Sequence, residues 1–372
     1  MENITVMDWK DEIIVDMMPN IIVLSFYLLV GICGNVLVLS VYACQMKNLS
    51  DERYFIPILA ACDLIATVFF GSFAIYNLIN QVTFSSSVLC KTIFFFSGLA
   101  TFIPICVLLI IAIQRYLKMC MNLNHSKKLL FKRLSLVLAT LLSVIVASPI
   151  PFVHELIPVH NYRYNITGMR CGSSPKGNNL ARNVYVITVG VFGVTIGTTF
   201  IALYSKIAYK IFVHFKSSSN QNDKKVKEIK VEANDRENKD PANYKTNQEH
   251  PTDNDYQVNS NENDSNTPII SKQTGSAKRQ KKDRGITYRM AIMFFVITLI
   301  FFISYTPKLV MNIISGIYKD FAVNLSTSQR TAIMFVNDMF IINNIVNPFI
   351  YAFMDTKFRK EAKTLLKRAF DC

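Results

Sequence analysis

The chain has 372 residues, and 51% of them are hydrophobic although the chain also contains a long polar stretch. This composition indicates a membrane protein rather than a soluble enzyme. The formal net charge of +14 fits either nucleic-acid binding or the excess of Lys and Arg that membrane proteins carry on their inner side.

Several stretches are apolar over the roughly 20 residues of helix that a bilayer crossing requires. We predict seven membrane-spanning helices over residues 20–45, 55–79, 92–116, 133–153, 184–213, 287–316 and 328–354. These stretches are too uniformly apolar to offer the polar face of a helix in a soluble bundle. The predicted fold is therefore an all-α seven-transmembrane bundle over 20–354, preceded by an extracellular tail over 1–19.

The distribution of Lys and Arg predicts the orientation of the bundle. Most of the 40 Lys and Arg residues fall on segments that lie inside if the N-terminus lies outside, and the short segment 117–133 agrees with the longer ones. We therefore predict an extracellular N-terminus and a multi-pass protein of the plasma membrane. Because topology explains the charge, nucleic acid is not expected as a partner.

Residues 217–284 differ in kind from the spans. The stretch contains no Leu, Phe, Met, Trp or Cys and is rich in Asn, Lys, Asp and Ser. It cannot bury enough apolar surface to fold, so we predict a disordered third intracellular loop. At the other end, 355–372 alternates apolar residues with Lys and Arg, which indicates a short amphipathic helix and a cytoplasmic tail.

The eight cysteines test the predicted orientation. Only Cys90 and Cys171 fall on the outer side, the oxidising side on which disulfides form, so we predict one bridge between them. On the inner side, Cys372 is a candidate for palmitoylation. The sequons on outer segments, which are glycosylation candidates, begin at Asn3, Asn165 and Asn324.

Few polar side chains lie within the spans, where ionisable groups are unfavourable and usually functional. The residues that can share one buried polar network, with water or a small cation, are Asn35, Asp63, Asn343 and Asn347. Helix–helix hydrogen bonding without further function is an equally good interpretation for Asn35. Pro307 and Pro348 are expected to kink their helices, because proline removes a backbone hydrogen bond.

These landmarks together resemble a rhodopsin-like (class A) G-protein-coupled receptor. The resemblance rests on Asn35 after Gly34, on "LAACD" ending at Asp63, on Cys90 with Cys171, on Arg115-Tyr116, on Phe301 with Ser304-Tyr305-Thr306-Pro307, and on "NPFIY" at 347–351. It implies a G-protein switch made by Gln114, Arg115, Tyr116, Tyr204 and Tyr351. It also implies a toggle region made by Phe301, Tyr305 and Pro307.

The chain departs from the family pattern at several of these positions. Gln114 stands where the family has an acid, Thr287 where it often has a glutamate, and Tyr305 where it has tryptophan. We therefore expect raised signalling without ligand, since a neutral amide binds the arginine more weakly than a carboxylate does. No cofactor is expected apart from a sodium ion near Asp63, and Pro104 counts against that ion because the family often has a serine there.

The resemblance implies a receptor that binds an extracellular ligand and activates heterotrimeric G proteins by outward movement of the sixth span. Ser97 occupies the position of the aspartate of monoamine receptors, and residues 331–354 lack the lysine of visual pigments, so amine and retinal ligands are disfavoured. We expect a peptide, with a lipid or nucleotide-like small molecule as the alternative. The ligand-pocket candidates are Ser97, Thr101, Tyr305, Asn337 and Asp338.

A transporter or channel is the alternative from a different class, and it is disfavoured because the two halves of the chain show no symmetry. An enzyme is not expected, because the spans contain no cluster of ligands at metal spacing and no nucleophile motif. Arrestin and receptor kinases are expected as further partners, through Ser and Thr of 217–284.

Overall fold

The structure, a computed structural model, describes residues 4–46, 53–121, 128–173, 179–237, 269–317 and 326–370. Within these residues, 7 helices are long and apolar enough to cross a membrane. They are Val6–Cys44, Phe55–Ile79, Ser87–Cys120, Lys132–Val153, Leu180–Val213, Gly285–Met311 and Ser328–Met354. The predicted seven-span fold is confirmed, and its ends agree within a few residues except at the start of the first span.

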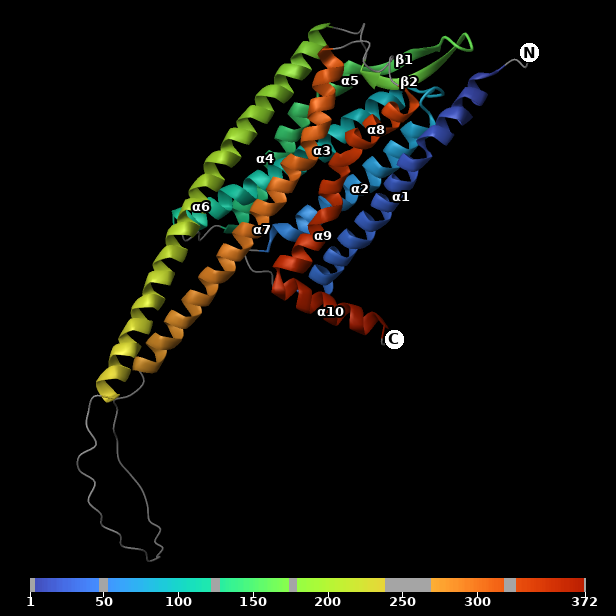
Figure 1. The fold of residues 1–372 in the computed structure, drawn as a ribbon. Coiled ribbons are helices and arrows are strands. Elements are labelled where there is room, and N and C mark those ends of the chain that lie inside the picture. The colour runs from blue at the N-terminus through green and yellow to red at the C-terminus, as the bar shows by residue number, and fades with distance from the viewer. Residues whose placement is uncertain are drawn as a thin grey trace, which may run out of the picture. The chain divides into compact units, whose positions relative to one another are not determined.

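The elements of the first four spans are α1 (Val6–Cys44), α2 (Phe55–Ile79), α3 (Ser87–Cys120), α4 (Lys128–Ala147) and α5 (Ile150–Val153) (Figure 1). A hairpin of β1 (His154–Asn161) and β2 (Ile166–Ser173) follows. The remaining elements are α6 (Asn179–Glu237), α7 (Ile269–Ile317), α8 (Thr327–Asp338), the 3-10 turn η1 (Met339–Ile341), α9 (Ile342–Met354) and α10 (Thr356–Phe370). The seventh span is thus α8, η1 and α9.

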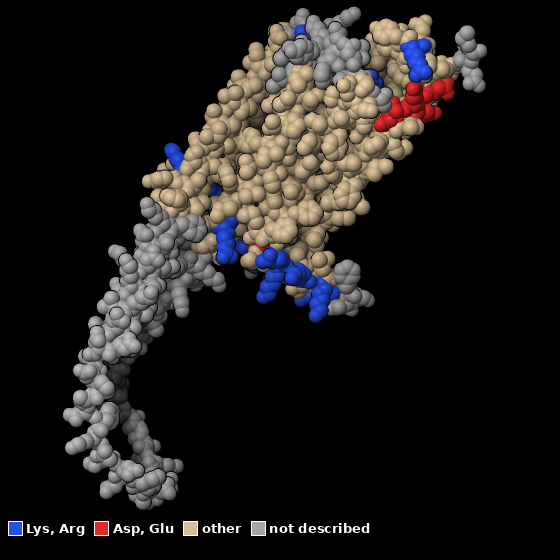
Figure 2. All heavy atoms as spheres, in the orientation of Figure 1, with Lys and Arg blue, Asp and Glu red and all other residues tan. Residues whose placement is uncertain are grey.

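The chain divides into two compact units, Met1–Ile207 with Thr287–Cys372, and Ala208–Ile286. In the first unit, α1 packs against α2, α9 and α10, while α3 packs against α2, α4 and α5. The surface in Figure 2 shows acidic side chains over the N-terminal end of α1, Lys and Arg over α10, and an almost uncharged band between them. This band is the surface that a bilayer would cover.

The second unit changes the interpretation of 217–284. Here α6 continues to Glu237 and α7 begins at Ile269, so parts of the range predicted to be disordered are helical. Residues 238–268 lie outside the described residues. The helices α6 and α7 extend into this range because an existing helix lengthens without a new nucleation step. The Lys, Glu and Ala of the extensions are also good helix formers.

The first span begins earlier than predicted, because within the predicted tail 1–19 the residues from Val6 onward are helical. A capping box starts the helix. The Thr5 Oγ1 accepts a hydrogen bond from the Asp8 backbone N–H at 3.3 Å, and the Asp8 carboxylate accepts one from the Thr5 N–H at 2.7 Å. These two bonds satisfy backbone donors that the first helical turn leaves free.

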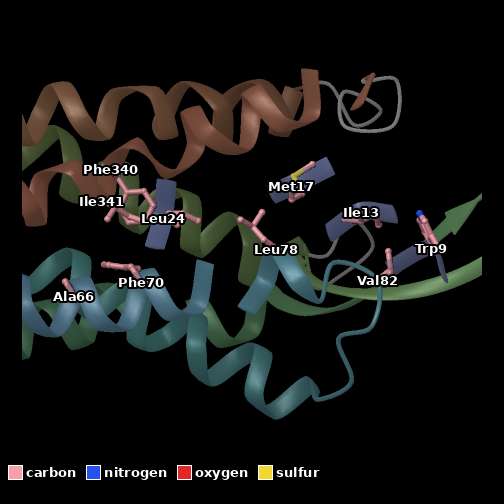
Figure 3. Packing of buried hydrophobic residues seen from close by; sticks show 10 residues of the cluster. All are labelled: Trp9, Ile13, Met17, Leu24, Ala66, Phe70, Leu78, Val82, Phe340 and Ile341. Carbon is pink, nitrogen blue, oxygen red and sulfur yellow. The ribbon is translucent and has the colours of Figure 1, made fainter. Parts of the chain in front are cut away.

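A hydrophobic stripe attaches this outer part of α1 to the bundle. Trp9, Ile13 and Met17 recur every four residues, are buried, and belong to one cluster with Leu78 and Val82 (Figure 3). Outside the bilayer, water supplies the driving force, and burial of one such side chain contributes about 1.5–3 kcal/mol. The sequence interpretation missed this stripe because the acidic residues between its members dominate the composition of 1–19.

The sequence analysis did not predict the hairpin of β1 and β2, which adds two antiparallel strands to the helical bundle. Its strands pair antiparallel from His154 with Ser173 to Asn161 with Ile166. Asn165 in the turn has a φ of 52°, a left-handed conformation that asparagine tolerates. The Met169 N–H donates to Val82 at 2.8 Å, and its carbonyl accepts from Phe84 at 2.9 Å, so the loop after α2 holds β2 in place.

The predicted amphipathic helix is α10, and a buried ion pair fixes its start. Arg53 donates through Nε and Nη2 to the Asp355 carboxylate at 2.7 and 2.9 Å, and both side chains are buried. The same carboxylate accepts a hydrogen bond from the Lys357 N–H at 3.0 Å. Phe358 and Ala362 then turn into the bundle, while Lys and Arg of α10 stay exposed.

Replacing Arg53 with alanine is expected to destabilise the receptor by about 3–5 kcal/mol, because it leaves the buried Asp355 carboxylate without its cation. The measurement is the melting temperature of the purified receptor, followed with a thiol-reactive dye. Lys357→Ala removes an exposed cation next to the same carboxylate and should leave the melting temperature within about 1 °C. Equal stability of Arg53→Ala and Lys357→Ala would contradict the role of the ion pair.

Candidate functional site

The inner part of the site centres on Arg115, which is only 1% exposed at the inner end of α3. Its guanidinium lies over the Phe294 ring of α7, 5.2 Å from the centroid. It also interacts electrostatically with Tyr204 of α6. The Tyr204 hydroxyl in turn forms a hydrogen bond of 3.1 Å with Thr298 Oγ1 of α7. These contacts join α3, α6 and α7 at one point.

The other predicted switch residues lie around this point in different ways. Gln114 is half-buried, and its Oε1 accepts no hydrogen bond from any residue that the structure describes. The Lys206 ammonium lies over the Tyr116 ring, 5.5 Å from its centroid. Tyr351 is fully buried, and its ring meets Phe358 of α10 edge to face at 6.2 Å. The structure thus brings Arg115 near Tyr204 and places Tyr351 against α10.

The predicted toggle residues form an aromatic chain that reaches the seventh span. The rings of Phe301 and Tyr305 lie 4.4 Å apart, and Tyr305 lies 5.6 Å from Phe340. Phe340 belongs to η1, where the seventh span loses its regular helix, and meets Phe70 of α2 at 5.0 Å and 90°. Pro307 lies inside α7, two residues beyond Tyr305. Sequence reasoning missed Phe340 because nothing local marks it among the other apolar residues.

The four residues of the predicted polar network are all buried, and hydrogen bonds link α1 and α2 to α9. The Asn35 amide donates to the carbonyls of Gly31 and Asn344 at 3.0 and 2.9 Å. The Asn347 amide donates to Asp63 Oδ2 at 2.6 Å. The first and second spans are therefore each tied to the seventh by an asparagine.

Several oxygens of this region have no hydrogen-bond partner among the described residues. They are Asp63 Oδ1, Thr67 Oγ1, Asn343 Oδ1 and Asn347 Oδ1. Buried acceptors of this kind call for water or a cation, and hard oxygen donors suit a small cation such as sodium. Pro104 is buried in α3 and supplies no side-chain oxygen, so any such ion would draw its ligands from α2 and α9.

The ligand-pocket candidates lie on α3, α7 and the outer end of the seventh span. Thr101 Oγ1 donates to the Ser97 carbonyl at 2.9 Å, and its side chain interacts with Tyr305. The Ser97 hydroxyl has no hydrogen-bond partner among the described residues. Asn337 and Asp338 are half-buried at the end of α8. Asp338 also lines a small hollow between α1 and α8.

Lys308 is a functional candidate that sequence reasoning did not single out. It follows Pro307 in α7, and its ammonium lies 3.6 Å from the centroid of the Phe340 ring. The sequence count assigned it to the outer end of a span, where a cation needs no explanation. A signal was nevertheless present, because the cation stands beside a proline within an apolar run.

The disulfide between Cys90 and Cys171 is confirmed, with Cα atoms 5.6 Å apart. It joins β2 to the start of α3, and beside it His154 begins β1. The His154 ring stacks on Phe94 at 3.9 Å, and its Nδ1 lies 3.0 Å from the Ile150 carbonyl. Burial lowers the pKa of His154, and the charge of Lys308 lowers it further, so the neutral ring is favoured.

The modification candidates are only partly within the described residues. Asn165 is exposed in the turn of the hairpin, which is compatible with a glycan. Asn3, Asn324 and Cys372 lie outside the described residues.

Comparison with known proteins gives a consistent result. The model of the family described as 7 transmembrane receptor (rhodopsin family) matches residues 34–351. The human cholecystokinin receptor type A is 24% identical over 349 residues, which are 91% of this chain and 78% of that protein. The QRFP-like peptide receptor of Branchiostoma floridae is 26% identical over 197 residues, 52% of each chain.

Among solved structures, the crystal structure of squid rhodopsin superimposes with a TM-score of 0.64. The superposition covers 100% of this chain and 89% of the squid chain at 14% sequence identity. At this level of identity the likeness describes the fold alone.

Proposed function

We propose that this chain, which belongs to the rhodopsin family of seven-transmembrane receptors, binds an extracellular peptide and activates heterotrimeric G proteins. Family membership makes the chain a multi-pass protein of the plasma membrane and a receptor rather than an enzyme. The peptide is supported by the relatives, which are receptors for cholecystokinin and for QRFP-like peptide.

The observation that carries the G-protein proposal is the inner contact between α3, α6 and α7. Arg115 lies against Phe294, and Tyr204 forms a hydrogen bond with Thr298, so the inner end of the sixth span is held to two neighbours. A ligand that favours release of these contacts lets the inner end of α7 move outward around Pro307. This is a population shift between two packings, and the released space receives the G protein.

The experiment is a screen of secreted peptides on cells that express the receptor, with calcium and cyclic-AMP readouts. A positive peptide is then tested for nucleotide exchange on purified heterotrimeric G protein. Stimulated exchange supports the proposal. If the purified protein instead carries solute across proteoliposome membranes and no peptide stimulates exchange, the transporter alternative is correct. A positive response to a lipid or nucleotide alone would favour the small-molecule alternative.

Two further roles belong to the same proposal. Asp63, Thr67, Asn343 and Asn347 would hold a sodium ion through the oxygens that lack protein partners, and the ion would supply positive charge beside the carboxylate. Arrestin and receptor kinases would act on Ser and Thr of 217–284, part of which lies outside the described residues.

Signalling without ligand is expected to be raised in this receptor and to depend on the contact of Arg115 with Phe294. Phe294→Leu removes a cation–π contact of about 0.5–2 kcal/mol and should raise basal nucleotide exchange roughly two- to tenfold. Gln114→Asp supplies a carboxylate beside Arg115 and should lower basal exchange. Both are measured in membranes at matched receptor density.

Phe295→Leu is the matched control, because this neighbouring ring is exposed and contacts Tyr204 instead of Arg115. Basal exchange of the wild-type receptor no higher than that of empty membranes would contradict raised signalling. An unchanged rate in Phe294→Leu would contradict the role of the cation–π contact.

A further inference from the structure

Lys308 is a cation held within the sixth span by an aromatic ring. Its ammonium lies 3.6 Å from the Phe340 centroid, a close cation–π contact, and the side chain is half-buried. No residue that the structure describes accepts a hydrogen bond from this ammonium, although it has three N–H donors. A charged group at this depth is unfavourable unless a partner compensates it.

The acid that faces Lys308 compensates it only in part. Asp338, two residues before Phe340, interacts electrostatically with Lys308 but forms no direct ion pair with it in the described part of the chain. Asp338 instead lines the hollow between α1 and α8, together with Asn20 and Tyr27. Among the described residues, the donors of Lys308 therefore lack an acceptor, which a ligand can supply.

Two further electrostatic interactions of the described residues involve basic side chains. The charge of Lys308 reaches His154 at the start of β1, and Arg170 on β2 interacts with Arg330 on α8. The acid that interacts with Lys308 is Asp338. Like charges repel one another, and an anion placed near Arg170 and Arg330 would relieve that repulsion.

We infer that the ligand presents a carboxylate to the Lys308 ammonium, so that the receptor recognises a peptide with an acidic group. This inference rests on the proposed function and specifies the ligand of the same site. The carboxylate belongs either to an Asp or Glu side chain or to a free peptide C-terminus. Charge-assisted hydrogen bonds to the ammonium are the strong contacts that such a ligand gains.

The position of Lys308 also connects this contact to the toggle region. Phe340, under the ammonium, lies 5.6 Å from Tyr305, and Tyr305 lies 4.4 Å from Phe301. A carboxylate that draws the ammonium away from the ring changes the packing of all three aromatic residues. Recognition of the acid and rearrangement of the sixth span are then one event.

The test measures binding without any G protein, so that it stays separate from the proposed function. The full-length receptor is purified in lipid nanodiscs, and its melting temperature is measured with two synthetic hexapeptide mixtures. One mixture has Glu at a fixed position and the other Gln, and each is prepared with a free and with an amidated C-terminus. Acidic mixtures should raise the melting temperature by about 5 °C, and the fully amidated Gln mixture should not.

Variants at Lys308 and at Asp338 are expected to change the stabilisation by acidic mixtures in opposite directions. Lys308→Gln should lose the stabilisation, Lys308→Arg should retain most of it, and Asp338→Asn should increase it by removing the competing carboxylate. Arg163→Gln, at the turn of the hairpin, removes a distant outer cation and should behave as the wild type. A merely structural role of the charges would not make Asp338→Asn bind better.

Several outcomes would overturn the inference. They are equal stabilisation by neutral and acidic mixtures, no stabilisation by any acidic mixture, and weaker binding by Asp338→Asn. If Lys308→Gln does not fold, the stabilisation of Lys308→Arg and of Asp338→Asn by acidic mixtures still tests the inference. Stabilisation by acidic peptides without nucleotide exchange would support the carboxylate contact and refute the G-protein proposal. Exchange driven by neutral peptides alone would support the G-protein proposal and refute the carboxylate contact.

Discussion

Arg115→Ala is expected to abolish ligand-stimulated nucleotide exchange, with a loss of tenfold or more at unchanged surface expression. The arginine is buried at the inner end of α3, lies over Phe294 and interacts electrostatically with Tyr204. Alanine removes the contact of α3 with both neighbours and the cation that would meet the G protein. The measurement is exchange on purified G protein by membranes that contain equal amounts of receptor.

Two control variants separate this role from general effects of charge. Arg133→Ala removes an exposed cation near the inner end of the fourth span and should leave exchange unchanged. Arg115→Lys keeps the charge but loses the planar guanidinium that stacks on a ring, so intermediate exchange is expected. Wild-type exchange in Arg115→Ala would refute the role that we assign to this residue.

Cys90→Ser or Cys171→Ser is expected to remove most receptor from the cell surface. The bridge closes a separation of 81 residues and ties β2 to the start of α3. Both cysteines are buried in one cluster with Phe84, against which Phe94 and Leu156 pack. Removal of a disulfide of this kind destabilises a protein by about 2–5 kcal/mol. Surface labelling of an epitope-tagged receptor measures the loss.

The matched control is Cys44→Ser, because Cys44 is a free, exposed cysteine at the end of α1. It should reach the surface as the wild type does. The double variant Cys90→Ser with Cys171→Ser should be no worse than either single variant, since both remove the same bond. Normal surface levels of the single variants would contradict a structural role of the bridge.

Much of the architecture could be predicted because its physical causes are local or compositional. A span needs only enough consecutive apolar residues to cross the bilayer, so 55–79 was predicted with the bounds that α2 has. The orientation follows from counting Lys and Arg, and the bridge from having two outer cysteines. The amphipathic helix is visible in the apolar Phe358 and Leu365 among charged residues.

The N-terminal helix and the hairpin were missed for two different reasons. The helix has local signals, the capping box at Thr5 and the four-residue spacing from Trp9, but the acidic composition of 1–19 outweighed them. The hairpin has weaker local signals. Its position depends on backbone bonds between Met169 and the loop after α2, which are distant in the sequence.

Composition and short sequence patterns are sufficient to define the seven spans, their orientation, the disulfide and the residue types available for a switch. Which side chains meet depends on how the helices pack. Arg115 contacts Phe294, Lys308 lies over Phe340, and Arg53 pairs with Asp355. The partners in these pairs lie on different segments of the chain, and a contact of that kind exists only after the helices have packed.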